Sequence, residues 1–189
     1  MANPDDATAI SYSRMARFFH WLTVLLLLIT VPVGMTMTYR GKELNLWDST
    51  TNTLYSAHKL LGIVILGVVV LRLIYRLRHG APQDEPSLSG VQRIVAHVVH
   101  WSLYGLLIII PVVGWLGVSM FPALDVFGLF ALPSLATPDK AGAELMFQLH
   151  DILGSVLLTL IAIHVTAALL HQFYFRDSVL RRMWPAKSR

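Results

Sequence analysis

Four apolar stretches, each long enough to cross a membrane, constrain this chain more than any other feature of its sequence. They run over residues 18–39, 55–77, 95–120 and 145–175, and charged residues are nearly absent from their middles. A hydrocarbon core of about 30 Å requires roughly 20 residues of helix, so each stretch is predicted to span the bilayer once. The first stretch is too long for the apolar segment of a signal peptide, and no cleavage site of small residues follows it. The sequence therefore predicts an all-α, integral-membrane four-helix bundle, with residues 1–189 as one domain.

The composition supports the membrane class and limits the cofactor chemistry. The chain is 55% hydrophobic and 14% charged, with a mean hydropathy of +0.60, which is too apolar for a soluble domain of this length. It contains no cysteine, which excludes disulfides, thiolate zinc sites, iron–sulfur clusters and c-type haem attachment. Any metal centre must use histidine, methionine or carboxylate ligands, and eight histidines are available.

The distribution of lysine and arginine predicts the orientation. Eleven basic residues fall on the side of the N-terminus: Arg14, Arg17, Arg72, Arg76, Arg78, Arg93, Arg176, Arg181, Arg182, Lys187 and Arg189. Four fall on the opposite side: Arg40, Lys42, Lys59 and Lys140. The positive-inside rule then places both termini in the cytoplasm. The pI near 9.6 is interpreted as attraction to an anionic leaflet, and no feature indicates nucleic-acid binding.

The connecting segments carry turn-forming residues. They are RGKELNLWDSTTN after the first span, RHGAPQDEPSLSG after the second and FPALDVFGLFALPSLATPDKAG after the third. The last one is long enough to contain a short interfacial helix.

The two halves of the chain resemble each other. HWLTVLLLLITVPVG (20–34) matches HWSLYGLLIIIPVVG (100–114): both open with His-Trp, carry a late proline and reach glycine fourteen residues after the histidine. HKLLGIVILGVVVLR (58–72) matches HDILGSVLLTLIAIH (150–164), so that position 72 corresponds to position 164. The first pair of helices is therefore interpreted as a divergent copy of the second, although two unrelated apolar hairpins would match by chance rather often.

The repeat places histidines at two depths. His20 and His100 begin helices near the cytoplasmic face, and His58 and His150 begin helices near the periplasmic face. Fourteen residues of helix rise about 21 Å and return to within about 40° of the starting direction, so His150 and His164 share one face of one helix. They are too far apart to bind one metal ion, so each needs a partner on another helix. Two cofactors, one above the other, are the simplest interpretation.

Haem suits this geometry, because its iron takes axial imidazoles on opposite sides of a flat apolar macrocycle that fits between helices. Gly62 and Gly154 lie one turn beyond His58 and His150, where a missing side chain would let a porphyrin approach the backbone. Gly34, fourteen residues from His20, would leave similar room at the other depth, and Arg72 is expected to pair with a propionate. A single histidine would equally serve as a hydrogen-bond donor between helices.

The remaining histidines have weaker assignments. His79 is expected to lie beyond the end of its helix, in solvent, while His97 and His100 lie three residues apart and either competes as a ligand. His171, seven residues past His164, is placed about 20° off the same face, where it would hydrogen-bond a quinone carbonyl or face the lipid headgroups.

Several segments together resemble the bacterial cytochrome b561 family over essentially the whole chain. They are YSRMARFFHW, HKLLG followed by LRLIYRL, and HDILG with IHVTAALLHQFYFRDSVLRRMWP. The resemblance implies a multi-pass protein of the bacterial inner membrane with two b haems. By the family pattern, His20 and His164 would be the axial ligands on the cytoplasmic side and His58 and His150 those on the periplasmic side, which leaves His97 and His100 without a ligand role.

The resemblance also implies a function, since family members carry electrons between periplasmic chemistry and the quinone pool. We expect an oxidoreductase that passes electrons from a periplasmic donor, with superoxide as the leading donor and a periplasmic redox protein as another, to ubiquinone. Lys59 would attract an anion such as superoxide or extend to the headgroups. The alternatives are a membrane anchor that relays electrons between a partner dehydrogenase or hydrogenase and the quinone pool, and a haem-free transporter with a histidine relay. No Ser/His/Asp arrangement, phosphate loop or pair of catalytic carboxylates is evident within the spans.

Overall fold

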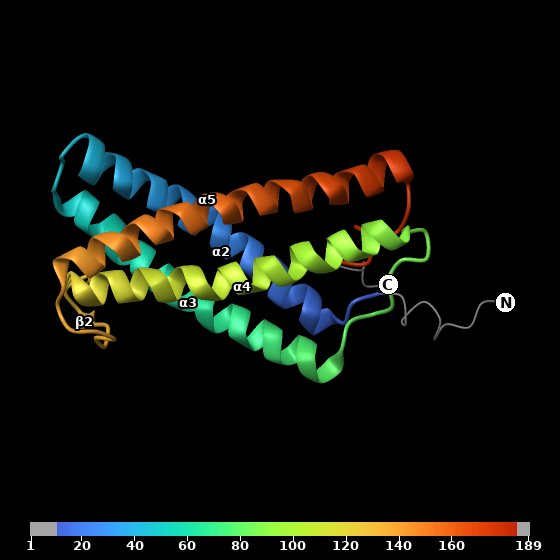
Figure 1. Ribbon diagram of the computed structural model, residues 1–189, viewed down its shortest axis with the longest axis horizontal. Helices are drawn as coiled ribbons and strands as arrows, with labels where there is room; N and C mark the ends of the chain where they lie inside the picture. The colour runs from blue at the N-terminus through green and yellow to red at the C-terminus, as the bar shows by residue number, and fades with distance from the viewer. Residues whose placement is uncertain (1–10, 185–189) are drawn as a thin grey trace.

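The computed structural model describes residues 11–184, and four long helices dominate them (Figure 1). They are α2 (Arg14–Thr38), α3 (Ser49–His79), α4 (Gly90–Met120) and α5 (Lys140–Leu170). α2 continues into a π-helical turn, η1 (Tyr39–Glu43), and α5 into another, η2 (His171–Phe175). All four helices are long and apolar enough to cross a membrane. The predicted all-α membrane four-helix bundle is therefore confirmed.

Each of the first three helices begins at a polar cap that lies before its apolar stretch. The side chains of Ser13 and Asp48 each accept a hydrogen bond from the backbone N–H three residues further on. Ser89 and Gln92 form a reciprocal capping box at the start of α4. Such caps satisfy N–H groups that the helix itself leaves unpaired. The helices consequently start before the boundaries predicted from hydropathy alone, which marked only the apolar residues.

The helices pack as two hairpins. α2 packs against α3, α4 packs against α5, and the contact between α3 and α4 joins the two hairpins. We call the end of the bundle that holds the start of α2 and the end of α5 the inner end, and the opposite end, with the α2–α3 and α4–α5 connections, the outer end (Figure 1).

A small apolar core fills the middle of the bundle. It consists of buried side chains of α3, α4 and α5: Ile65, Val69, Tyr104, Leu107, Ile110 and Leu157. In α3 these residues lie between His58 and Arg72, in α5 Leu157 lies between His150 and His164, and in α4 they follow His100. Burial of this apolar surface stabilises the contact between the hairpins and separates the two groups of polar side chains.

The connection between α4 and α5, which is long enough for a short interfacial helix, contains a β-hairpin instead. Strands β1 (Asp125–Val126) and β2 (Phe130–Ala131) pair antiparallel, and no helix lies between Met120 and Lys140 in this described segment. Three prolines in the segment remove backbone donors that a helix would need. The turn places Phe127 and Gly128 at positive φ, and the Asp125 side chain accepts the Gly128 N–H at 2.9 Å.

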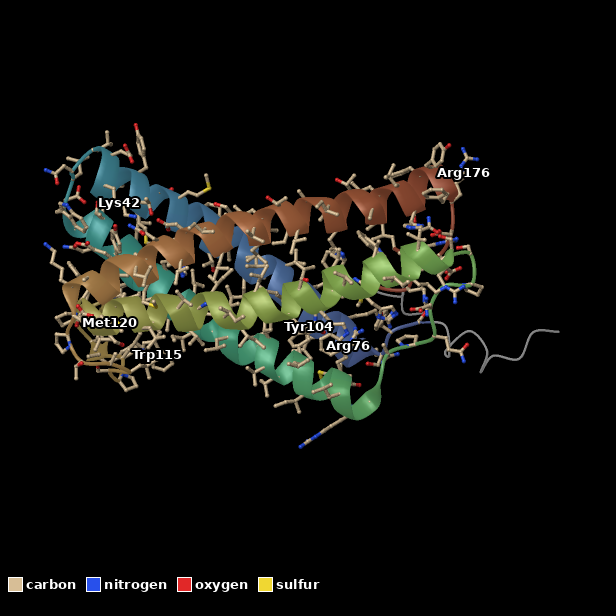
Figure 2. All side chains as sticks on the ribbon, viewed as in Figure 1. Lys42, Arg76, Tyr104, Trp115, Met120 and Arg176 are labelled. Carbon is tan, nitrogen blue, oxygen red and sulfur yellow. The ribbon has the colours of Figure 1, made fainter. Side chains whose placement is uncertain are left out.

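The two ends of the described chain meet at the inner end. The Tyr12 N–H donates to the Arg182 carbonyl at 3.3 Å, and the indole N–H of Trp21 donates to the Met183 carbonyl at 2.9 Å. Figure 2 shows Arg76 and Arg176 toward this end and Lys42 at the outer end. Lys187 and Arg189 lie outside the described residues. That the inner end faces the cytoplasm stays a prediction from the charge bias.

Removing the cap of α3 should destabilise the outer end. Asp48 accepts the Thr51 N–H at 2.8 Å and pairs with Arg40 at 2.6 Å. The Thr51 N–H and then the Arg40 guanidinium hold the pKa of Asp48 below its usual range. Because that pKa is lowered in the folded protein, the stabilisation is present at neutral pH and is lost as the pH falls through the lowered value. We expect Asp48→Ala to lower the thermal midpoint at pH 7, measured by circular dichroism in detergent.

Asp48→Asn is the matched control, because asparagine caps a helix but carries no charge for Arg40. Its midpoint should lie between those of the wild-type protein and Asp48→Ala. An Asp48→Ala midpoint equal to that of the wild type at pH 7 would contradict the role of this cap.

Candidate functional site

Two histidines from different helices face each other near the outer end. His58 of α3 and His150 of α5 have ring centroids 5.9 Å apart, with their planes at 76°. Nδ1 of His150 lies 3.0 Å from the Ile110 carbonyl oxygen, which can only accept, so this nitrogen carries the proton. Nε2 of a neutral His150 then keeps its lone pair, which is the state of an imidazole that binds a metal.

His58 occupies the equivalent position in the other half of the chain. Its ring interacts with the Thr30 carbonyl, and Thr30 corresponds to Ile110 in the repeat. The buried Nδ1 of His58 nevertheless makes no hydrogen bond of ordinary geometry with residues 11–184. A buried nitrogen without a partner is costly, so the ring as it stands is incompletely satisfied.

Glycines make room for both outer histidines. A Cβ atom at Gly34 would lie 2.8 Å from Cε1 of His58, and one at Gly114 would lie 2.9 Å from Nδ1 of His150. Gly34 therefore lies at the outer level, against His58, and not at the other depth, where the sequence analysis placed it. Gly34 and Gly114 are equivalent in the repeat, so the same close approach of helix and imidazole occurs twice.

The glycines predicted to border a cofactor face open space. Only the Pro111 Cβ lies near the position that a Cβ of Gly62 would take, at 4.0 Å, and nothing lies within 4 Å of that position at Gly154 among the described residues. Both glycines thus leave room beside the outer histidines, as a flat group between the helices would require.

Three histidines come together near the inner end. The His20 and His164 ring centroids are 6.4 Å apart, and the His100 ring is closer to His164, at 5.3 Å. The spacing of His97 and His100 left both as candidates, and the structure separates them. His97 instead contacts the Asp84 carboxylate in the α3–α4 loop at 3.2 Å. His79 is the last residue of α3, where it is exposed and contacts the Tyr75 carbonyl.

His20 differs from His150 in its hydrogen bonding. Nη2 of Arg72 donates to Nδ1 of His20 at 3.1 Å, since a guanidinium has no acceptor. A neutral His20 in this contact carries its proton on Nε2. Binding a metal through Nε2 therefore requires Arg72 to move to another acceptor and His20 to change tautomer.

Arg72 and Arg76 form a cationic pair beside the inner histidines. The Arg72 guanidinium lies 5.0 Å from the Tyr104 ring centroid, and that of Arg76 lies 5.7 Å from the Trp101 ring and 5.8 Å from the Tyr104 ring. No carboxylate forms an ion pair with either arginine among residues 11–184. Partly buried cations without a counter-charge are costly, so this arrangement is suited to hold an anionic group.

Two lysines of the outer end, Lys59 and Lys42, are already engaged. The Lys59 ammonium donates to the Ala123 carbonyl at 2.9 Å and to the Asp125 carbonyl, which ties α3 to the hairpin. The sequence suggested an anion or the lipid headgroups as the partner of Lys59, and it did not reveal these two carbonyls. Lys42 pairs with Asp151 at 3.3 Å, next to His150, and both side chains are more than half exposed.

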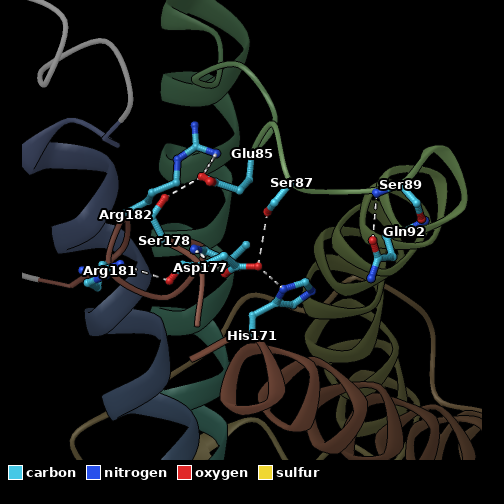
Figure 3. A network of polar contacts seen from close by, with 10 residues as sticks. Glu85, Ser87, Ser89, Gln92, His171, Asp177, Ser178, Arg181 and Arg182 are labelled. Atoms are coloured by element: carbon cyan, nitrogen blue, oxygen red, sulfur yellow. Dashed lines mark hydrogen bonds and ion pairs between the residues drawn. The ribbon is translucent and has the colours of Figure 1, made fainter. Parts of the chain in front are cut away.

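His171, which the sequence placed near the inner level, pairs with a carboxylate. Its Nδ1 lies 2.6 Å from Oδ2 of Asp177, as Figure 3 shows. No feature of the sequence singled out Asp177, because the contact depends on the sharp turn that follows η2.

The ring separations fit haem better than a bare ion. Two imidazoles bound at about 2 Å to opposite sides of one iron have ring centroids about 6 Å apart. The described residues contain no group of three or more His, Cys, Asp or Glu side chains placed to hold a metal ion by themselves. Imidazoles that face each other in pairs, at two levels of an apolar four-helix bundle, define a membrane cytochrome of the b type.

Comparison with known proteins agrees with this class. The family model of prokaryotic cytochrome b561 matches residues 11–186, so the chain belongs to that family. It is consequently a multi-pass bacterial membrane protein with the electron-transfer role of a b-type cytochrome.

Curated relatives match nearly the whole chain. Cytochrome b561 homolog 2 of Escherichia coli is 29% identical over 91% of this chain and 90% of its own length. The probable superoxide oxidase CybB of Yersinia pestis is 29% identical over 93% of this chain and 97% of its own length. Cytochrome b561 homolog 1 of Escherichia coli is 27% identical over 93% and 98%. These relatives support an oxidoreductase.

Substitution of Gly34 tests the outer level. The Cβ of Gly34→Ala would push His58 away from its position, so we expect the amount of bound haem per chain to fall. Gly67→Ala is the control, because a Cβ at Gly67 meets nothing within 4 Å among the described residues. The pyridine haemochrome assay and low-temperature spectra would measure both. Full haem retention in Gly34→Ala with an unaltered spectrum would contradict the assignment.

Proposed function

We propose that this protein, as a single domain, transfers electrons through two b haems from a periplasmic donor, with superoxide as the leading donor, to ubiquinone. The observation that carries the proposal is the pair of imidazole contacts at two levels, 5.9 Å between His58 and His150 and 6.4 Å between His20 and His164. A haem iron supplies a one-electron carrier when bound. The activity is 2 superoxide + ubiquinone + 2 H⁺ → 2 O₂ + ubiquinol.

At the outer level the chain's own groups are prepared for this role. The Ile110 carbonyl orients His150 so that Nε2 is free to bind iron, and Thr30 occupies the equivalent place for His58. Gly62 and Gly154 leave space beside the two rings. His58 and His150 are therefore the residues that would hold the outer haem.

At the inner level the family resemblance favours His20 and His164, while the distances also admit His100 as the partner of His164. A propionate is a charged acceptor and would attract Arg72 more strongly than the neutral His20 ring does. If Arg72 moved to the propionate, Nδ1 of His20 would be free to carry the ring proton. Nε2 of His20 would then be free to bind iron. Arg72 thus has a second proposed role: His20 could bind iron only when an anion has drawn Arg72 away from it.

The distribution of charge supports electron movement from the outer to the inner level. Within residues 11–184 the inner end carries nine basic and three acidic residues, whereas the outer end carries four basic and six acidic ones. Positive charge stabilises an added electron. An anionic donor would meet local cations at the outer end, where the Lys59 ammonium donates to hairpin carbonyls and Lys42 lies beside the outer pair.

The first test is a reduced-minus-oxidised visible spectrum of the detergent-purified protein, with haem quantified per chain. Two b haems that superoxide reduces and a ubiquinone analogue reoxidises would support the proposal. Two haems that react with neither reagent would favour a membrane anchor for another redox subunit. A colourless protein expressed with sufficient haem would overturn the proposal and favour a histidine-relay transporter.

Separate substitutions test the two levels. We expect His150→Ala to remove only the outer haem and His164→Ala only the inner one, because the two rings lie at different depths of α5. Each variant should hold about one haem per chain, with complementary losses in the spectrum. Retention of both haems in both variants would contradict the ligand assignment. His100→Ala should retain both haems if His20 is the inner partner, and should lose the inner one if His100 is.

His171 is the proposed contact of the quinone. His171→Ala should keep both haems, since His171 is one residue beyond α5 and seven past His164, but it should slow reoxidation of the reduced protein by a ubiquinone analogue about 100-fold. Stopped-flow spectroscopy would measure this rate. An unchanged rate would indicate that His171 only anchors the helix end.

A further inference from the structure

The chain beyond α5 turns back so that an acidic side chain meets His171. α5 ends in the π-helical turn η2, and Arg176 then adopts a left-handed conformation, with φ 55° and ψ 34°. The Asp177 N–H reaches the His171 carbonyl at 3.2 Å. A left-handed non-glycine residue after a π-helical turn is uncommon, and both features often accompany functional sites.

The resulting contact between His171 and Asp177 is short and shielded. Nδ1 of His171 lies 2.6 Å from Oδ2 of Asp177, and the two side chains are only 14% and 9% exposed. Oδ1 of Asp177 accepts the Val179 N–H at 3.1 Å, and Oδ2 lies 3.4 Å from the Ser87 hydroxyl (Figure 3). Both carboxylate oxygens are thus held in place. The Nδ1 proton points at the carboxylate, which leaves Nε2 as the working nitrogen of the ring.

A second polar group beside His171 has no partner. Oε1 of Gln172 is buried and accepts no hydrogen bond from residues 11–184. Such an acceptor needs a donor, and a quinol hydroxyl is one. Gln172 follows His171 directly in η2, so a buried acceptor that lacks a donor lies in the same turn as the proposed quinone contact.

Other charged groups connect this pair to the surface of the inner end. The Arg181 guanidinium donates to the Asp177 carbonyl at 3.4 Å, and Ser178 donates to Glu85 at 2.5 Å. Glu85 also lies 3.8 Å from the Arg182 guanidinium. Asp177 is the one acidic side chain in direct contact with His171 among the described residues.

We propose that Asp177 is a positioning residue that holds His171 for proton delivery to the quinone. This inference rests on the proposed placement of ubiquinone at His171. Reduction of ubiquinone to ubiquinol takes two electrons and two protons. His171 donates a proton from Nε2 to a quinone oxygen, and Asp177 keeps the ring oriented by accepting the hydrogen bond of Nδ1. The ring then regains a proton from the inner aqueous side before the second transfer.

A purely structural role for Asp177 predicts something different. The same segment is tied down by the contact of Ser178 with Glu85, by the Arg182 guanidinium on the Gln83 carbonyl and by the Trp21 indole on the Met183 carbonyl. If Asp177 served only to fasten this segment, its loss would resemble the loss of Ser178.

Asp177→Asn separates the two roles, because it keeps the shape of the side chain and removes its charge. In the detergent-purified holoprotein, reduced with dithionite, we expect reoxidation by a short-tailed ubiquinone analogue to slow about 10- to 100-fold. Haem content, the visible spectrum and the rate of haem reduction by superoxide should match those of the wild type. Added formate, a small weak acid, should restore part of the rate, whereas a structural defect would not respond to it.

Ser178→Ala is the matched control, one residue further along the same segment, and its rate should stay within about twofold of the wild type. Asp177→Glu, which keeps the carboxylate, should retain more activity than Asp177→Asn. If Asp177→Asn loses haem, the comparison of Asp177→Glu with Ser178→Ala, with and without formate, decides between the roles. An Asp177→Asn rate equal to the wild type, or an equal fall in Asp177→Asn and Ser178→Ala without rescue, overturns the proposal. A wild-type protein that the analogue does not reoxidise overturns the quinone assignment itself, which is a distinct result.

Discussion

Imidazole rings held between apolar helices are the constraint on which the rest of this structure depends. A polar side chain inside a membrane bundle is costly unless it faces the interior and finds a partner. The surroundings accommodate three of the rings: glycines lie opposite His58 and His150, a backbone carbonyl lies behind His150, and Arg72 donates to His20. The apolar core of α3, α4 and α5 separates the two levels and keeps them about two-thirds of a membrane apart.

The internal repeat explains why the two levels are alike and where they differ. Gly34 against His58 corresponds to Gly114 against His150, so the outer level is nearly symmetric. At the inner level His20 contacts Arg72 in one half, and His100 lies against His164 in the other. Position 72 thus carries an arginine where the equivalent position 164 carries a histidine. The first half of the chain therefore has an anion-binding side chain where the second half has an imidazole. The inner level thus has a guanidinium in contact with one of its imidazoles, and in the proposed function this positive charge would favour electrons at the inner level.

Sequence reasoning succeeded where a property depends on spacing along one helix. The four spans follow from apolar length, and the two levels follow from the fourteen residues between His150 and His164. The contacts that it missed depend on segments between helices. Lys59 binds carbonyls of a hairpin that hydropathy does not reveal, and His97 is drawn to Asp84 of a loop. Asp177 reaches His171 only because Arg176 adopts a left-handed conformation, which its residue type does not favour.

The closures at the two ends of the bundle are built differently, and the difference suits the two partners proposed. The outer end is closed by the short α2–α3 connection and by the β-hairpin between α4 and α5, and Lys42 is more than half exposed there. A small anionic donor of the kind proposed would meet this cation at the surface. The inner end is closed by residues 176–184. This segment folds back over the beginning of α2 and over the α3–α4 loop, and polar contacts hold it there. A quinone has an apolar tail that stays in the membrane and a headgroup that must gain protons from water. A site at the membrane boundary, bordered by a fixed carboxylate–imidazole pair on that closing segment, meets both requirements.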